Sequence, residues 1–193
     1  YYGKLPPTFP LPGILSRMDS ITKKYYDNYR KKIPPILKGK LNEKLVDAQC
    51  AEALRKGIKC SFTELNAELK GKMDDCMIGD DEKYVVIDNK TANPDNEELL
   101  GVYKMQLDAY AFLLQQNNYR TAKHGYLIYY VPESGDPEKG VVFKAEVKKL
   151  ALSPERIPQI IKDTVSLLRK SSPPKAHKDC EMCKYLRDLE DRD

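Results

Sequence analysis

The chain has 193 residues, 41% of them hydrophobic, so it is long enough to bury a core, and we expect a single domain over residues 1–193. Its formal net charge of +4 is a mild excess that does not by itself identify a partner. No apolar stretch has the length of a signal peptide or a membrane span, so we expect an intracellular protein, cytoplasmic or nucleoid-associated, with no membrane partner. The five cysteines are expected to be reduced, because disulfides are rare in that setting.

Basic residues concentrate near the N-terminus, whereas residues 188–193 are acidic. The basic group comprises Lys23, Lys24, Arg30, Lys31, Lys32, Lys38, Lys40 and Lys44. Such a face suits a polyanion, and an ordinary solvated surface is the alternative.

The N-terminal third of the chain is expected to be an extended arm followed by helices. Four prolines within residues 1–13 predict an arm without internal hydrogen bonds. Apolar residues at three- and four-residue spacing predict an amphipathic helix over 14–32. A second helix is expected over about 37–56 and is closed by Gly57, so that residues 14–56 form an N-terminal helical segment.

After Gly57 the hydrophobic period changes from helical to strand-like. We expect strands at 58–67, 68–78 and 83–90, a helix at about 97–117, strands at 124–131 and 140–149, a helix at 154–170 and a short helix from about Cys180. Neighbouring strands followed by a helical crossover predict an α/β fold with a mixed central β-sheet flanked by helices. Residues 57–150 would form this core, and residues 151–193 would form C-terminal helices.

The strand at 83–90 ends in polar residues that a core strand does not need. Side chains alternate along a strand, so Asp88 and Lys90 are expected on one face and Asn89 on the other. A turn at 79–82 would pair this strand with the preceding one and bring Asp74 beside them. An isolated Asp-x-Lys is also typical of a surface salt bridge, which is the alternative interpretation.

Two carboxylates and a lysine on one face suit phosphodiester hydrolysis. Mg²⁺ is held by one or two carboxylates together with waters and phosphate oxygens, and Asp74 and Asp88 could supply these carboxylates. Lys90 could orient or deprotonate the attacking water and stabilise the developing negative charge.

Three motifs in this order resemble those of the PD-(D/E)xK nuclease superfamily, specifically its RecB-like and Cas4-like branch. The motifs are Gly71-x-x-Asp74, Asp88-x-Lys90-Thr91 and Gln106-x-x-x-Tyr110. The resemblance covers nearly the whole chain and implies a restriction-endonuclease-like core.

The resemblance also implies roles for individual residues. Asp74 and Asp88 would be metal ligands, the backbone carbonyl of Asn89 a further ligand, and Lys90 the catalytic lysine. Glu43 would stand where this branch usually has a histidine ligand. The neighbouring Asn42 and Asp75 leave the choice of residue open at two of these positions, with Asp74 favoured over Asp75 by its spacing from Gly71.

Further residues would support the site or contact DNA. Gln106 and Tyr110 lie one helical turn apart and would contact DNA or support the lysine. Lys23, Lys24 and Arg30 are candidates for holding a DNA strand by charge.

Cys180 and Cys183 resemble part of the cysteine set that holds an iron-sulfur cluster in many Cas4-like proteins. A third C-terminal cysteine is missing, and the early helix has no cysteine at the corresponding place. The pair is therefore interpreted as vestigial, and neither an iron-sulfur cluster nor zinc is expected.

These observations predict a Mg²⁺- or Mn²⁺-dependent deoxyribonuclease. It would be an exonuclease or end-processing enzyme that acts on single-stranded DNA or on free ends in recombination, repair, or phage or CRISPR DNA processing. Protein partners in a DNA-processing complex are compatible with this prediction. The alternative is a non-catalytic DNA-binding or assembly module that retains the nuclease fold.

Overall fold

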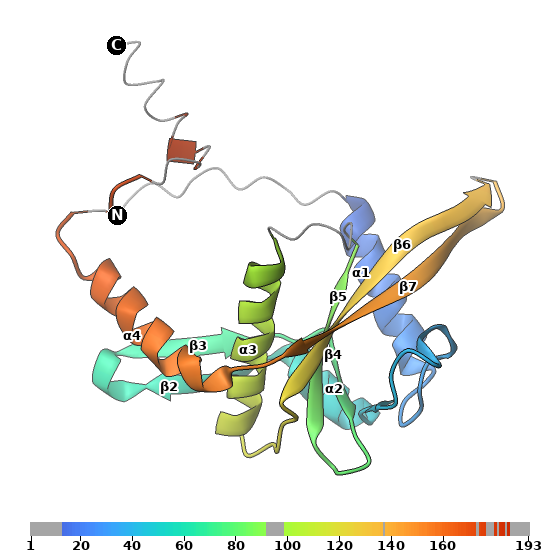
Figure 1. Cartoon of the computed structure of the whole chain (residues 1–193), viewed down its shortest axis with the longest axis horizontal. Helices are drawn as coiled ribbons and strands as arrows, with labels where there is room; N and C mark the ends of the chain where they lie inside the picture. The colour runs from blue at the N-terminus through green and yellow to red at the C-terminus, as the bar shows by residue number, and fades with distance from the viewer. Residues whose placement is uncertain are drawn as a thin grey trace. The chain divides into compact units, whose positions relative to one another are not determined.

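A computed structural model describes residues 13–91, 99–136, 138–172, 174–176, 180, 182–183 and 185 (Figure 1). The chain divides into two compact units, which are Phe9–Pro158 and a second unit of Tyr1–Thr8 with Gln159–Asp193. Most of the predicted arm at 1–13 and most of the predicted helix from Cys180 lie outside the described residues.

The first unit is built around a mixed five-stranded sheet with the order β1-β4-β5-β6-β7. The strands are β1 (Lys44–Leu45), β4 (Asp75–Ile78), β5 (Tyr84–Lys90), β6 (His124–Asp136) and β7 (Gly140–Ala151). The central strands β5 and β6 run parallel, and the other neighbouring pairs are antiparallel. A parallel pair needs a crossover, and α3 (Leu100–Gln116) lies between these two strands in the chain. The predicted α/β fold with a mixed sheet and flanking helices is confirmed.

The chain contains further helices and a β-hairpin outside this sheet. They are α1 (Gly13–Asp27), α2 (Ala48–Lys56), the hairpin of β2 (Ile58–Phe62) and β3 (Ala67–Gly71), and α4 (Ile157–Leu168). Most of α4 belongs to the second unit. Among the described residues, no helix is both long enough and apolar enough to cross a bilayer.

Two hydrophobic cores occupy the two faces of the sheet. One contains Val86 of β5 with Leu107 and other residues of α3. The other contains Ile87 of β5 with Tyr26 of α1. A strand that is covered on both faces must be apolar at successive positions, which explains the run from Val85 to Ile87. The alternation also determines that Asp88 belongs to the α3 face of the sheet.

The predicted helix over 37–56 is wrong in its first half, because only Ala48–Lys56 is α-helical. Before it, Lys44–Leu45 pairs with β4 as an edge strand. The Asp47 side chain then accepts a hydrogen bond of 2.8 Å from Cys50 N and so caps the helix. The helical spacing upstream of Asp47 therefore belongs to residues that pack as strand and loop.

The predicted strands at 58–67 and 68–78 are three strands in the structure. Asn66 adopts a left-handed conformation with φ of 48° and turns β2 back onto β3. This hairpin is a separate two-stranded sheet that packs on α3, where the rings of Phe62 and Phe112 stack 6.0 Å apart. Residues 72–74 then lead into β4, and the predicted turn at 79–82 joins β4 to β5.

Candidate active site

The hairpin of β4 and β5 brings two carboxylates together at one end of the sheet. Asp75 pairs with Ile87 in the antiparallel register, so Asp74 lies across from Asp88 and on the same face. Asp88 is only 4% exposed, whereas the side chain of Asp74 is 26% exposed. The pair therefore has one acid buried in the sheet and one acid at the solvent edge.

Asp88 forms a close ion pair with Lys90 on the same face of β5. Lys90 Nζ is 2.5 Å from Asp88 Oδ2, but the contact lacks hydrogen-bond geometry, and this buried oxygen has no hydrogen-bond partner among the described residues. Burial raises the pKa of Asp88 above its ordinary value, and the charge of Lys90 only partly opposes this rise. A buried carboxylate oxygen that lacks a directed partner fits a site for a second cation.

The Lys90 ammonium is contacted from the α3 side by two side chains, and a third continues the hydrogen-bond chain. Its Nζ donates to Gln106 Oε1 at 3.1 Å and lies 4.0 Å from the centre of the Tyr103 ring. Gln106 Nε2 donates to Tyr110 OH at 2.9 Å, and this hydroxyl donates to the backbone oxygen of Lys72 at 2.8 Å. The chain of contacts fixes the lysine relative to the segment that carries Asp74.

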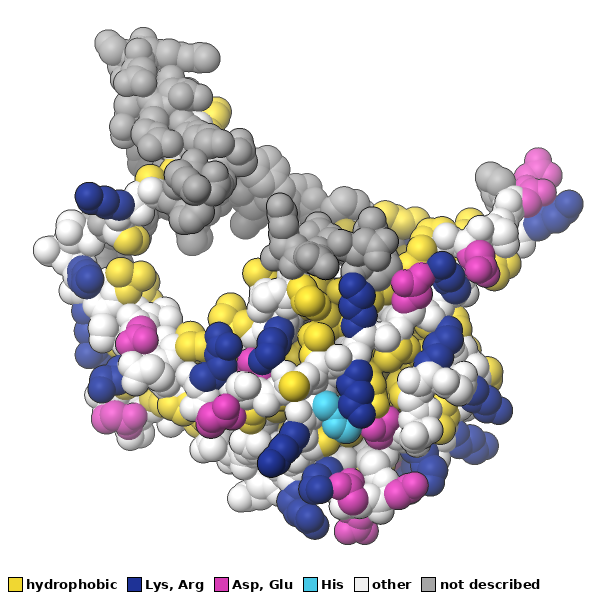
Figure 2. Space-filling model, viewed as in Figure 1, with side chains coloured by type: hydrophobic (Ala, Val, Ile, Leu, Met, Phe, Trp, Pro, Cys, Tyr) yellow, Lys and Arg dark blue, Asp and Glu magenta, His cyan; other side chains and the backbone are white. Residues whose placement is uncertain are grey.

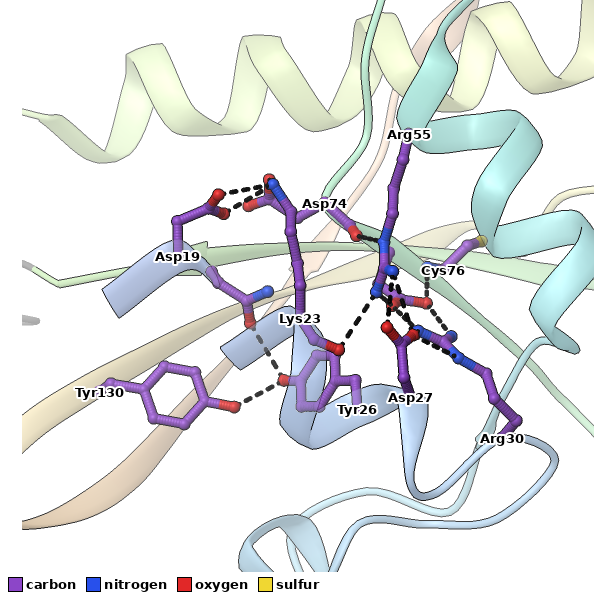
Figure 3. Close-up of polar contacts among 11 residues, drawn as sticks. Asp19, Lys23, Tyr26, Asp27, Arg30, Arg55, Asp74, Cys76 and Tyr130 are labelled. Atoms are coloured by element: carbon purple, nitrogen blue, oxygen red, sulfur yellow. Dashed lines mark hydrogen bonds and ion pairs between the residues drawn. The ribbon is translucent and has the colours of Figure 1, made fainter. Parts of the chain in front are cut away.

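Helix α1 reaches the same site through Lys23 (Figure 3). Lys23 Nζ lies 3.1 Å from Asp74 Oδ1 and 2.7 Å from Asp19 Oδ1. Burial alone would lower the pKa of Lys23, but the hydrogen bond to Asp19 and the charge of Asp74 outweigh it and raise that pKa. Sequence reasoning missed Asp19, although its four-residue spacing from Lys23 predicts a helical ion pair.

Asp75, the neighbour of Asp74, takes part in a buried network of ion pairs. Its fully buried carboxylate accepts hydrogen bonds from Arg30 Nη1 at 2.7 Å and Arg30 Nη2 at 2.6 Å, and from Arg55 Nη2 at 2.9 Å (Figure 3). Asp27 contacts both arginines. The Arg30 side chain is only 11% exposed and is held by these acids, and its predicted contact with DNA stays a prediction.

Glu43 lies apart from the pair of Asp74 and Asp88. It accepts hydrogen bonds from Tyr126 OH at 3.0 Å and lies 3.0 Å from His124 Nε2. Tyr126 packs in the core on the α1 face, opposite to Asp88. Burial and the Glu43 carboxylate raise the pKa of Tyr126 to about 12. The structure does not bring Glu43 to the metal site that the sequence predicted for it.

The side chain of Asn89 also points to the α1 face. Its Oδ1 accepts a hydrogen bond of 3.0 Å from Tyr26 OH. The Tyr26 hydroxyl in turn accepts one of 2.7 Å from Tyr130 OH (Figure 3). Tyr26 is fully buried, so this network anchors α1 to the end of β5. The predicted role of the Asn89 backbone carbonyl is not tested by these contacts.

Lys24, Cys180 and Cys183 are the remaining predicted site residues. Lys24 is exposed on α1, one residue after Lys23. The described ranges include Cys180 and Cys183 as isolated positions, and within those ranges no group of three or more His, Cys, Asp or Glu side chains is arranged to hold a metal.

The fold and the motif residues together agree with a comparison against protein families. The chain belongs to the PD-(D/E)XK nuclease superfamily, whose family model matches residues 16–187. Members of this superfamily are generally nucleases that use divalent metal ions, which implies a nucleic acid substrate.

Comparison with solved structures finds similarity to a crystal structure of SSO0001, with 20% sequence identity and a TM-score of 0.46. The match covers 91% of this chain and 66% of that chain, so this chain corresponds to part of the other protein's length. Comparison with curated proteins finds no match.

Proposed function

We propose that this chain is a metal-dependent DNA nuclease that hydrolyses phosphodiester bonds. The observation that carries the proposal is the placement of Asp74 and Asp88 across the β4–β5 hairpin, with Lys90 2.5 Å from Asp88 on the same face. Acids and a lysine so arranged are the groups that hydrolysis of a phosphodiester requires.

The carboxylates fit a hard divalent ion such as Mg²⁺ or Mn²⁺. Asp88 Oδ2 is buried without a hydrogen-bond partner in the described part of the chain, and Asp74 offers a second, more exposed carboxylate. The backbone carbonyl of Asn89 is proposed as a further oxygen ligand. A bound ion would supply Lewis-acid activation of water and neutralise charge on the phosphate.

Lys90 is proposed to be the catalytic lysine. Its ammonium is fixed by Gln106 and the Tyr103 ring, so it is oriented before substrate arrives. From this position it can donate hydrogen bonds to the attacking water or to a phosphoryl oxygen as negative charge develops. Gln106 and Tyr110 are proposed to position this lysine, because their contacts continue from Lys90 to the backbone of Lys72.

We infer that the substrate is single-stranded DNA or DNA with free ends, and that the enzyme is an exonuclease or end-processing enzyme of the RecB-like and Cas4-like type. Lys23 and Lys24 on α1 supply positive charge beside the site. Figure 2 shows acidic and basic side chains interspersed on the face in view, so individual lysines, and not a continuous basic surface on that face, would contact the DNA.

One assay tests this proposal directly. End-labelled single-stranded and double-stranded DNA, in linear and circular forms, would be incubated with Mg²⁺, Mn²⁺ or EDTA. We expect degradation of linear DNA with either metal and none in EDTA. Asp88→Asn and Lys90→Ala should abolish it. DNA binding without cleavage in Mn²⁺ would instead favour a non-catalytic module that retains the nuclease fold.

A further inference from the structure

A pocket lined by lysines lies at the base of the β2–β3 hairpin. Its volume is about 290 Å³, and its lining includes Lys56, Gly57, Lys59, Lys70, Gly71 and Lys72. All four lysines are exposed. None of these residues belongs to the Asp74, Asp88 and Lys90 cluster.

The lysines of the hairpin are not required by its packing. Lys59 and Lys70 are cross-strand partners and point to the solvent face, whereas Ile58 and Leu69 on the other face pack against the core beside α3. Apolar burial therefore stabilises the hairpin through its inner face.

The pocket also retains a net positive charge. Lys56 pairs with Glu52, and Lys59 and Lys70 share Glu68. The Lys72 ammonium has no ion pair or hydrogen bond among the residues that the structure describes. Four lysines thus face two carboxylates, so an anion entering the pocket meets excess positive charge.

A glycine keeps the floor of the pocket open, and a second one lets the pocket wall pack closely on α3. Gly57 has a φ of +111°, and a Cβ at this position would lie 3.2 Å from Lys72 Cγ and 3.3 Å from the backbone oxygen of Gly71. A Cβ at Gly71 would lie 2.6 Å from Leu113 Cδ1. A side chain at Gly57 would crowd Lys72 and the Gly71 backbone, which line the pocket, whereas Gly71 is required by its packing against α3.

The pocket adjoins the candidate active site. Lys72 lines the pocket, and its backbone oxygen accepts the Tyr110 hydrogen bond of 2.8 Å that leads to Gln106 and Lys90. Asp74 follows Lys72 by two residues, which span at most about 7 Å. The pocket and the acids are therefore close enough to contact neighbouring phosphates of one DNA strand.

We propose that this pocket binds a backbone phosphate of the DNA strand whose scissile phosphodiester lies at Asp74 and Asp88. The proposal rests on the proposed nuclease function and adds a phosphate subsite on the β2–β3 side of the active site. Lys72 supplies an ammonium that has no partner among the described residues, and Lys59 supplies a second ammonium, which shares Glu68 with Lys70. Binding of this kind reads charge and not base sequence.

The test uses the full chain with Asp88→Asn, which prevents cleavage during the measurement. Fluorescence anisotropy would follow binding of a labelled 20-nucleotide single strand at several salt concentrations. The pocket variant is Lys59→Gln with Lys72→Gln, which leaves Lys70 to pair with Glu68. The control is Lys44→Gln with Lys83→Gln, which removes the same charge from two exposed pairs beside the β4–β5 turn.

Removing the lysine that neutralises one phosphate of a single strand should make the slope of log K against log salt shallower by about 0.7 and weaken binding about eightfold at 50 mM salt. We expect these changes in the pocket variant and not in the control, with melting temperatures that show both variants folded. Equal effects in the two variants, or no effect in either, would overturn the pocket proposal alone. Absence of DNA binding together with absence of wild-type cleavage would overturn the nuclease proposal as well.

Discussion

Replacing Asp75 with asparagine should damage the fold, whereas the same replacement of its neighbour Asp74 should damage the proposed chemistry. The Asp75 carboxylate is fully buried and accepts hydrogen bonds from Arg30 and Arg55 at 2.6–2.9 Å. These contacts join the turn after α1, helix α2 and strand β4. An asparagine would leave two guanidinium groups against a neutral amide.

The size of the expected loss of stability in Asp75→Asn follows from the burial of the Asp75 ion pairs. Removing one partner of a buried pair costs about 3–5 kcal/mol, because the other charge remains desolvated. Asp27 still pairs with Arg30 at 2.6 Å and with Arg55 at 3.0 Å, so we expect the lower end, about 3 kcal/mol. For a chain of this size, 1 kcal/mol shifts Tm by about 2–4 °C, which predicts a fall of roughly 6–12 °C.

Asp74→Asn is the matched control. Its carboxylate is partly exposed and pairs with Lys23, a contact of the kind that contributes about 1 kcal/mol or less. Circular dichroism melting would therefore show a change of a few degrees at most, while DNA cleavage in Mn²⁺ is abolished. An unchanged Tm for Asp75→Asn, together with full cleavage by Asp74→Asn, would show that the two acids have been assigned the wrong way round.

Three further variants separate structural from functional contacts. Glu43→Gln should retain cleavage but lose about 1–3 kcal/mol of stability from its charged hydrogen bonds. Burial alone would raise the pKa of Glu43, but its hydrogen bonds lower that pKa from 4.5. The stabilisation by the Glu43 carboxylate is therefore present above pH 4.5 and is lost as pH falls through the lowered pKa. The Tm difference from wild type should therefore narrow in acid, and a loss of cleavage would contradict the structural role. Lys23→Gln removes a cation from Asp74, and calorimetry should show Mn²⁺ bound roughly two- to fivefold more tightly; unchanged or weaker binding would oppose this. Tyr110→Phe removes the hydroxyl that links Gln106 to the Lys72 backbone, and the loss of about 1 kcal/mol from the positioning of Lys90 should lower kcat about fivefold with little change in KM. An altered KM alone would point to substrate contact.

The parts of the fold that follow from local patterns were predictable. The run before Asp88 must be buried on both faces, and residues 79–82 form the expected turn. The region at 37–47 was not predictable in the same way. Its apolar residues pack against β4 and the α1-side core, and tertiary pairing outweighs helical spacing there.

In the candidate site too, residues placed by local patterns were predictable, and residues placed by tertiary packing were not. Strand alternation and the hairpin place Asp88, Lys90 and Asp74 on one face, and helical spacing places Gln106 near Lys90. Which further acid reaches the site depends on how α1 and the β1 segment pack against the sheet, which no short motif encodes. The structure consequently brings Asp19 to the cluster through Lys23.

Mn²⁺ binding to wild type and to Asp88→Asn, measured by isothermal titration calorimetry, tests the central claim most directly. The buried Asp88 carboxylate, with an oxygen that has no hydrogen-bond partner among the described residues, is the group on which the proposed metal site depends. We expect wild type to bind the ion and Asp88→Asn to lose binding while it remains folded. Equal binding by the two proteins would contradict a metal centre at this site.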